Sequence, residues 1–172
     1  MQSTQFAHRV LKLFAIVLLL QFPFSVFSQP KSDSIAVKAL IDSAANAKSP
    51  QVRIAFAREA YHKAIATNSK RLLADATHAM GNALFRLNSY DTAIDTLQRA
   101  LVLYNIAGDI AGRAKTYYTL GSCYFRKSNY VKAIQLIEES VKLASSLNDS
   151  ALLANCYNSL GIVYYTLENY PT

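Results

Sequence analysis

Apolar side chains recur along this chain at the spacing expected of helices. Between residues 109 and 146, apolar side chains recur at steps of three and four, which places them on one face of a helix. The pattern predicts one helix from about Asp109 to Lys127 and a second from about Tyr130 to Ser146, joined by the polar pair Ser128-Asn129. Asp109 is the predicted N-cap, and Gly108 is the predicted end of the preceding helix. Because the connection is short, the two helices are expected to form an antiparallel hairpin.

This pattern repeats. The segment 81–94, GNALFRLNSYDTAI, returns forty residues later as GSCYFRKSNYVKAI and begins a third time at Gly161. When residues 81–120 are aligned with 121–160, twelve of the forty positions are identical, whereas chance would give about two or three. A fixed period of this length is the signature of a stacked repeat.

Small residues recur at equal positions of the repeat. Gly81, Gly121 and Gly161 each fall inside a predicted helix, where glycine costs about 1 kcal/mol relative to alanine. This cost indicates that a neighbouring helix approaches closely there, and Ala93 and Ala133 suggest the same for the facing helix. The tyrosines at the turns are expected to wedge between hairpins; they are Tyr90, Tyr130 and Tyr170.

These residues and spacings resemble the tetratricopeptide repeat, in its subclass with a period of 40 rather than 34 residues. The second copy matches the family pattern at Tyr117, Leu120-Gly121, Tyr124, Tyr130, Ala133, Ile137 and Ser140. The first matches at Met80-Gly81, Leu84, Tyr90, Ala93, Leu97 and Ala100, and the third at Tyr157, Leu160-Gly161, Tyr164 and Tyr170. Departures are Thr77 at a position for a large residue, and Asn105 and Ser145 where proline is usual.

The resemblance implies an all-α fold, a right-handed α-solenoid of antiparallel helix hairpins. Residues 29–73 would form a degenerate N-terminal capping hairpin, in which Ile41 and Arg53 replace the expected Gly and Ala and Pro50 opens the second helix. Complete repeats would cover 74–113 and 114–153. Residues 154–172 would form an incomplete repeat with Leu160 and Tyr164 exposed, and the chain is therefore expected to be a fragment of a longer protein.

In such repeats, the first helix of each hairpin lines a concave groove that binds peptides. The repeat register selects twelve candidate groove residues: Asp75, His78, Asn82, Phe85, Lys115, Tyr118, Ser122, Phe125, Asn155, Asn158, Ile162 and Tyr165. Aromatic rings and amides suit a peptide with an apolar anchor and backbone hydrogen bonds, although Phe85 and Phe125 are equally consistent with a role in the core. The carboxylate clamp of chaperone-binding relatives is not supported, because His78 and Ser122 stand where Lys and Asn are needed.

The first 28 residues have the pattern of a signal peptide. His8, Arg9 and Lys12 precede an apolar run from Leu13 to Leu20, and small residues precede a predicted cleavage site before Gln29. A retained anchor is the alternative. The formal charge is +7, of which Arg9 and Lys12 contribute two, and the remaining basic residues are scattered. This distribution argues against nucleic acid as a partner and favours acidic partners only slightly.

No pattern in the chain predicts catalysis, a cofactor or a metal. His62 and His78 stand alone, and the five glycines form no phosphate-binding loop. Cys123 and Cys156 occupy different positions on equivalent helices and are expected to be buried and free. Asn148-Asp149-Ser150 matches a glycosylation sequon but fits better as a helix start.

These features lead to a non-enzymatic, exported module that binds a protein or peptide in its groove. Two alternatives stay open. The combination of a signal peptide and 40-residue repeats resembles the sensory N-terminal part of bacterial membrane sensor histidine kinases and transcriptional regulators. A periplasmic or outer-membrane assembly scaffold would share the same repeats.

Overall fold

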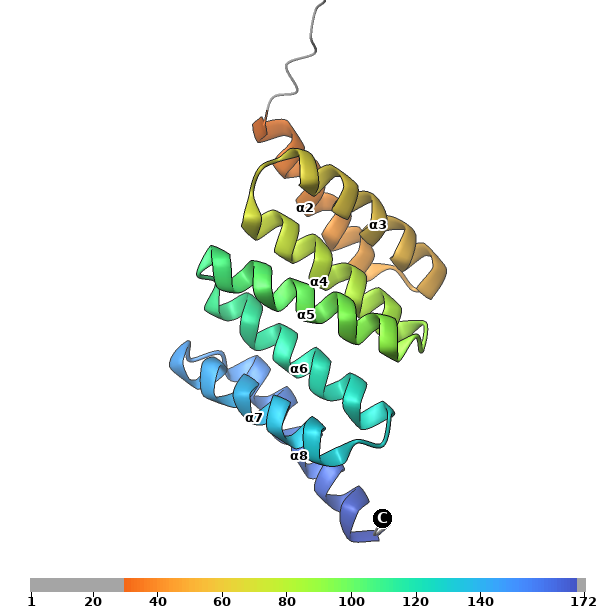
Figure 1. The fold of residues 1–172 in the computed structure, drawn as a ribbon, viewed down its shortest axis with the longest axis vertical. Coiled ribbons are helices and arrows are strands. Elements are labelled where there is room, and N and C mark those ends of the chain that lie inside the picture. Colours follow the sequence, from red (N-terminus) through yellow and green to blue (C-terminus); the bar gives the residue numbers. More distant parts are fainter. Residues whose placement is uncertain (1–29, 170–172) are drawn as a thin grey trace, which may run out of the picture.

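The computed structural model describes residues 30–169, and this part of the chain consists of seven helices joined by short turns (Figure 1). Their bounds are α2 Pro30–Asn46, α3 Pro50–Ala66, α4 Lys70–Arg86, α5 Tyr90–Ala107, α6 Ile110–Arg126, α7 Tyr130–Ser146 and α8 Ser150–Asn169. The predicted signal segment 1–28, its cleavage site and Tyr170 lie outside the described residues.

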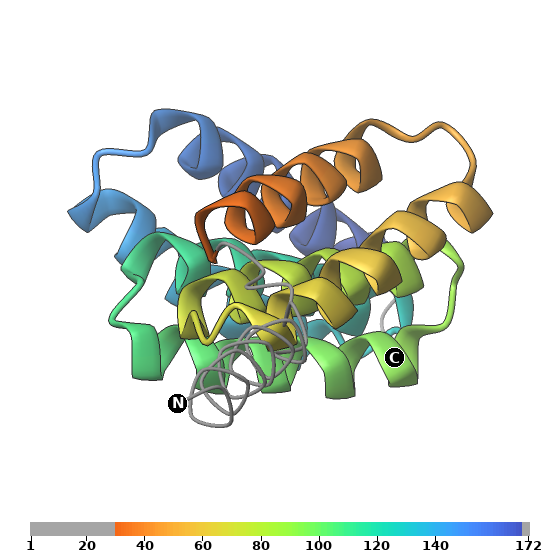
Figure 2. The ribbon, with the colours of Figure 1, turned by 90° about the horizontal axis from the view of Figure 1, so that it is seen from above.

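The helices stack as antiparallel hairpins in two layers. Helices α2 and α3, α4 and α5, and α6 and α7 pair within hairpins, and each hairpin also contacts the first helix of the next (Figure 1). The first helices, α2, α4, α6 and α8, contact one another in order and form one layer, while α3, α5 and α7 form the other (Figure 2). The prediction of an all-helical solenoid of hairpins is confirmed. The predicted divisions at 73/74, 113/114 and 153/154 fall within the first turns of α4, α6 and α8, and as domain limits they stay predictions.

Local signals in the sequence set the helix ends. Asp109 accepts a hydrogen bond from the Gly112 amide at 2.9 Å, and Asp149 accepts one from the Leu152 amide at 3.0 Å, so both are N-caps. Gly108 ends α5 in the left-handed region at φ 67°, and Pro50 opens α3. The predictions for Asp109, Gly108, Pro50 and the helix start near Asp149 are confirmed.

The repeated glycines are sites of close helix contact. A Cβ atom at Gly81 would lie 2.6 Å from Leu97 Cγ, and one at Gly121 would lie 2.6 Å from Ile137 Cγ1. Each contact joins the first helix of a hairpin to a branched side chain sixteen residues later on the second. The prediction of close approach at Gly81 and Gly121 is confirmed. Gly161 differs, because nothing lies within 4 Å of its Cβ position.

The first hairpin has the opposite order of large and small residues at these two positions. Ile41 stands at the glycine position and Ala57, sixteen residues later, is fully buried at the position of Leu97. Arg53, which replaces the expected alanine, donates hydrogen bonds to the carbonyl oxygens of Ala45 and Ala47 at 2.7 and 2.6 Å. Its guanidinium therefore satisfies carbonyl groups at the end of α2 that the helix leaves without partners.

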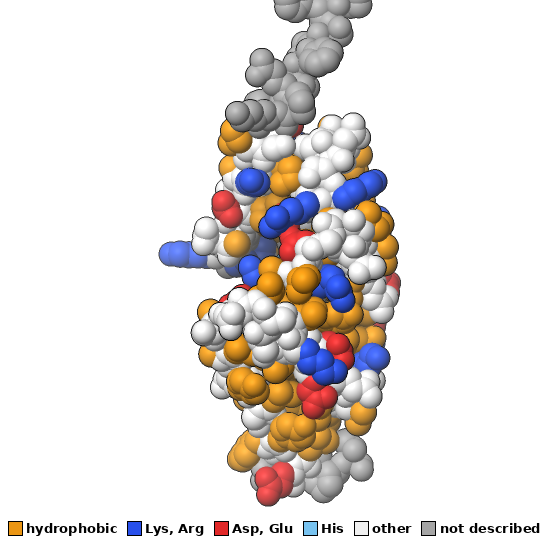
Figure 3. All heavy atoms as spheres, turned by 90° about the vertical axis from the view of Figure 1, so that its left-hand side faces the viewer, with side chains coloured by type: hydrophobic (Ala, Val, Ile, Leu, Met, Phe, Trp, Pro, Cys, Tyr) orange, Lys and Arg blue, Asp and Glu red, His pale blue; other side chains and the backbone are white. Residues whose placement is uncertain are grey.

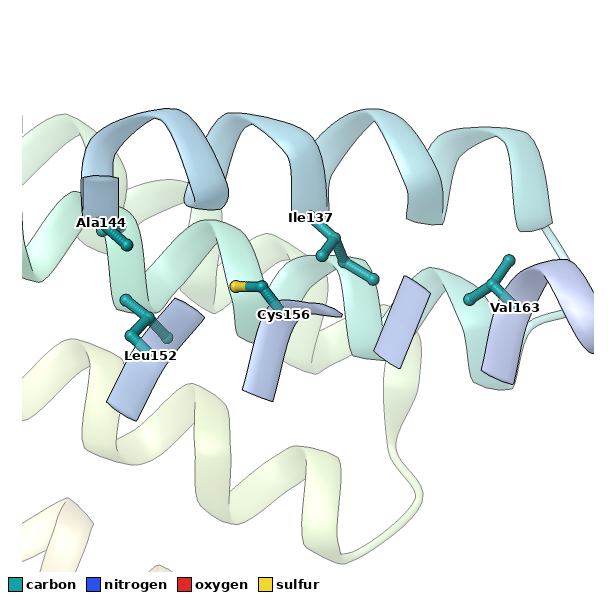
Figure 4. Close-up of a cluster of buried hydrophobic side chains, with 6 residues drawn as sticks. Ile137, Ala144, Leu152, Cys156 and Val163 are labelled. Carbon is teal, nitrogen blue, oxygen red and sulfur yellow. The ribbon is translucent and has the colours of Figure 1, made fainter. Parts of the chain in front are cut away.

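The core runs along the interface between the layers. Around α8 it contains Ile137, Ala144, Leu152, Cys156 and Val163 (Figure 4). Cys123 and Cys156 are both buried and free, as predicted. The Cys156 thiol lies 3.3 Å from Ser140 Oγ, and burial raises the pKa of the Cys123 thiol to about 12, so neither cysteine is expected to be reactive.

Helix α8 corrects one expectation for the third copy. Tyr164 is 52% exposed, as predicted, but Leu160 is half-buried and packs against the core cluster around Ile137. The prediction that Leu160 is exposed is wrong, since its side of α8 faces the preceding hairpin. Within residues 30–169, the helices are too short or too polar to cross a bilayer.

Candidate functional site

The candidate site is the surface of the layer formed by α2, α4, α6 and α8. Residues forty positions apart occupy equivalent positions on these helices, so they line up in rows that cross the layer from helix to helix. One row contains Lys38, His78, Tyr118 and Asn158, and another contains Asp42, Asn82, Ser122 and Ile162. Two pockets lie along these rows, and their linings differ in character.

The first pocket is polar and has a volume of about 370 Å³. It lies mainly among α2, α4 and α6, with one residue each from α3 and α5, and its lining includes Lys38, Asp42, Arg53, Asp75, His78, Asn82, Tyr104 and Lys115. This volume is within the range of small-ligand sites. Cationic, anionic and amide groups all reach the pocket, so it offers both donors and acceptors to a bound segment.

Asp75 and Tyr104 are hydrogen-bonded to each other in the lining of the polar pocket. The Tyr104 hydroxyl donates a hydrogen bond to Asp75 Oδ1 at 2.8 Å. Burial raises the pKa of the Asp75 carboxyl above its usual value, while the hydrogen bond from Tyr104 opposes this rise. Burial and the neighbouring carboxylate together raise the pKa of the Tyr104 hydroxyl, which therefore stays a donor.

His78 is held neutral in the same pocket. Its Nε2 lies 3.4 Å from Thr119 Oγ1, and its ring meets the Tyr104 ring edge-on at 6.4 Å between centroids. Burial, and secondarily the positive charge of Lys115, lower the pKa of His78 to about 4. At neutral pH the ring is therefore an uncharged hydrogen-bonding group.

The second pocket is apolar and aromatic, with a volume of about 210 Å³. It lies among α4, α6, α7 and α8 and is lined by Phe85, Ser122, Phe125, Arg126, Ile137, Ser159, Ile162 and Val163. Phe85 packs against Tyr90 and Phe125 against Tyr130, with ring centroids 5.9 and 5.8 Å apart. Both phenylalanines are half-buried, so they serve the core and the pocket at once. Tyr90 contacts the next hairpin, since its ring lies 5.5 Å from the Arg126 guanidinium, and the expected wedging of the turn tyrosines between hairpins stays a prediction.

The structure brings eight of the twelve predicted groove residues into these two pockets. Asp75, His78, Asn82 and Lys115 line the polar pocket, whereas Phe85, Ser122, Phe125 and Ile162 line the apolar one. The Tyr118 hydroxyl accepts a hydrogen bond from Ser159 Oγ at 3.3 Å. Asn155, Asn158 and Tyr165 are exposed on α8 and line neither pocket. Binding by these residues stays a prediction.

Sequence reasoning missed the contribution of the first hairpin. Lys38 and Asp42 also line the polar pocket, and they stand forty residues before His78 and Asn82. Extending the 40-residue register into α2 would have found both residues. Tyr104 had no such signal, because the equal positions of the neighbouring hairpins are Ala64 and Ala144.

The surface differs in charge from one end of the stack to the other. In the view of Figure 3, Lys and Arg side chains lie mainly over the upper, N-terminal part, and hydrophobic side chains gather over the lower part. Helix α8 has no Lys or Arg. The polar pocket therefore lies toward the basic end, and the apolar pocket lies toward the end with fewer basic side chains.

The low pKa of His78 predicts a loss of stability in acid. As the pH falls from 6.5 toward 4, the unfolded chain binds a proton at this residue while the folded chain does not. The free energy of unfolding should therefore fall across this window and level off below pH 4. Urea denaturation at several pH values measures this effect.

The contribution of His78 is isolated by comparing two substitutions. His78→Gln should remove most of the pH dependence between 6.5 and 4, whereas His62→Gln, at an exposed position, should leave it unchanged. The raised pKa of Asp75 acts in the opposite direction near pH 4 and is common to both variants. An unchanged pH profile in His78→Gln would contradict the neutral state of this ring.

The comparisons with known proteins agree with this architecture. Residues 112–172 match the tetratricopeptide repeat family, and the two hairpins upstream have helices of 17 or 18 residues and the same 40-residue register. The chain therefore contains tetratricopeptide repeats. No curated protein matches the chain. Repeats of this family are generally non-enzymatic modules for protein interaction, and residues 30–169 contain no cluster of side chains suited to a metal ion.

Proposed function

We propose that this chain is a non-enzymatic module that binds a peptide or protein segment in the groove along α2, α4, α6 and α8. The proposal is supported above all by the polar and the apolar pocket, which lie on the same layer of helices. A segment that carries an apolar side chain and, some residues away, a polar or charged group would fill both. Asn82 and Ser122 could in addition form hydrogen bonds with the backbone of the segment.

A selected peptide provides the test. A displayed library of random peptides of about 12 residues, about 40 Å long when extended, is selected on the chain, and the affinity of an enriched peptide is measured by fluorescence anisotropy. Lys115→Glu should weaken binding tenfold or more, equivalent to about 1.4 kcal/mol, because it reverses a charge at the polar pocket.

Lys132→Glu is the matched control. It makes the same charge change at an exposed position of α7 that lines neither pocket. Its affinity should equal that of the unaltered chain. Equal weakening by both substitutions would indicate attraction by net charge alone and would argue against the groove.

We further propose that the protein is exported and that residues 1–28 are removed before Gln29. Support comes from the basic start, the apolar run and the small residues before the cleavage site. N-terminal sequencing of protein from the cell envelope should begin at Gln29, and a start at Met1 would contradict removal.

The second candidate function is the sensory part of a bacterial signal-transduction protein, in which the same groove would bind the signal. Its support is the combination of a signal-like N-terminus with the 40-residue period. The complete coding sequence tests it, since it should then encode a membrane span and a kinase or DNA-binding domain. Further repeats alone would favour a periplasmic or outer-membrane assembly scaffold.

A further inference from the structure

An arginine without an acidic partner stands at the apolar pocket. Arg126 is the only charged residue in the lining of this pocket, which otherwise consists of apolar and serine side chains. It is exposed, in the last turn of α6. Within residues 30–169 its guanidinium forms no ion pair, whereas the adjacent Lys127 is paired with Asp91. The pocket therefore presents a positive charge that no acidic side chain in this part of the protein neutralises.

The contact that Arg126 does make leaves its donors available. Its Cζ atom lies over the Tyr90 ring, 5.5 Å from the ring centroid. Such a contact uses the charge of the guanidinium and none of its five N–H groups as hydrogen-bond donors. At the equivalent position of α4, Arg86 is also exposed, lies 5.9 Å from the ring centroid of Phe85 in the pocket lining, and forms no ion pair in residues 30–169. Positive charge thus lies beside both phenylalanines of the pocket.

We propose that the apolar pocket and Arg126 together bind an aliphatic or aromatic side chain and an adjacent Asp or Glu within the bound segment. This inference rests on the proposed function and names the chemistry that the groove selects at this place. The apolar side chain fills the pocket of about 210 Å³. The neighbouring carboxylate accepts hydrogen bonds from the Arg126 guanidinium, whose fork of N–H groups matches the geometry of a carboxylate.

The position of Arg126 also gives the order of the groups along the segment. On α6, Lys115 lines the polar pocket, Phe125 lines the apolar pocket, and Arg126 is the last residue of the helix. The eleven positions from Lys115 to Arg126 correspond to a rise of about 16 Å, which about five residues of an extended segment span. The acidic residue therefore lies beyond the apolar one, on the side away from the polar pocket.

Peptide selection tests this chemistry by reversing the charge at the pocket. The library of random peptides is selected in parallel on the unaltered chain, on Arg126→Glu and on Arg58→Glu. Peptides enriched on the unaltered chain should have Asp or Glu next to an aliphatic or aromatic residue, and those enriched on Arg126→Glu should have Lys or Arg there instead. Arg58→Glu makes the same change in net charge at an exposed position of α3 that lines neither pocket, so it should enrich the same acidic peptides as the unaltered chain.

A double-mutant cycle measures the contact itself. One enriched peptide is synthesised with a C-terminal amide, so that its only carboxylates are side chains, and a second form has the corresponding amide residue in place of the acidic one. Both forms are titrated with the unaltered chain and with Arg126→Gln by fluorescence anisotropy. Each single change should weaken binding about fivefold, as expected for an exposed ion pair. The two changes together should weaken it no further than either alone.

Reversal of the selected charge together with a non-additive cycle supports the proposal. It is overturned if the enriched peptides lack the acidic residue, if Arg58→Glu changes the selection as Arg126→Glu does, or if the two losses of the cycle add. It is also overturned if only the form with a free C-terminus binds, since the carboxylate would then be a chain end. The groove is judged separately: if Lys115→Glu weakens binding and Arg126→Glu leaves the selection unchanged, only this proposal fails, whereas the absence of any enriched peptide overturns both.

Discussion

Replacing Tyr104 with alanine should lower the free energy of unfolding by about 3–5 kcal/mol, the usual cost of removing a large buried ring. Tyr104 is 3% exposed and connects three helices. From α5 its ring covers Gly112 of α6, where a Cβ atom would overlap the ring, and its hydroxyl donates a hydrogen bond to Asp75 of α4. Urea denaturation followed by circular dichroism measures the loss.

The neighbouring hairpins suggest how to rescue this variant. The positions equal to Tyr104 and Gly112 are Ala64 and Leu72 in one interface and Ala144 and Leu152 in the next, where Figure 4 shows Ala144 and Leu152 close together. All four lie in the core. Large and small residues have thus changed places between helices, a volume-conserving exchange of the kind that cores tolerate.

Adding Gly112→Leu to Tyr104→Ala should therefore restore part of the lost stability, although the hydrogen bond to Asp75 stays absent. Gly112→Leu alone should be strongly destabilising, because its side chain would collide with the Tyr104 ring. A double-mutant cycle measures the coupling between the two positions. Simple addition of the two losses would contradict the complementary packing of Tyr104 and Gly112.

Gly121→Leu should lower the free energy of unfolding by about 1–3 kcal/mol or more, because it overfills a close helix contact. A Cβ atom at this position would lie 2.6 Å from Ile137 Cγ1 and 3.2 Å from the Ala133 carbonyl oxygen, so both a side chain and the backbone of α7 would have to move. Urea denaturation again provides the measurement.

Gly161→Leu, the same change at the equivalent position of the third copy, is the matched control. It should raise the free energy of unfolding rather than lower it. Nothing lies near the Cβ position of Gly161, so the variant keeps only the gain of replacing a helical glycine, about 0.5–1 kcal/mol. If both variants were destabilised equally, steric contact with α7 would not be the reason that glycine stands at position 121.

The sequence predicted the helices well because their signals are local. The three- and four-residue spacing of apolar positions, the Asp109 cap and Gly108 each act within one or two turns of the chain, and the structure has α6 and α7 within one residue of the predicted bounds. The 40-residue period also predicted how the hairpins stack, because equivalent positions of successive repeats lie at equivalent helix interfaces. The close approach of a helix at Gly121 was predicted from that period, and the structure shows that Ile137 makes the contact.

The candidate site was predicted less completely. The register selected groove residues on three helices, and eight of them line the pockets. It did not select Lys38 or Asp42, because α2 belongs to a hairpin whose key positions are changed. It also did not predict that the groove contains two pockets of different character. Their polar and apolar linings depend on which side chains of α2, α4, α6 and α8 come together in the fold.

The sequence by itself determined the repeat, the helix bounds, the close contacts at Gly81 and Gly121, and the free state of both cysteines. These depend on neighbours along the chain or on a spacing that is repeated. The tertiary structure alone decided the packing of Tyr104 on Gly112, the burial of Leu160 and the open space above Gly161. Each of these depends on whether a helix from another part of the stack lies against the residue, and that cannot be read from the residue and its neighbours in sequence.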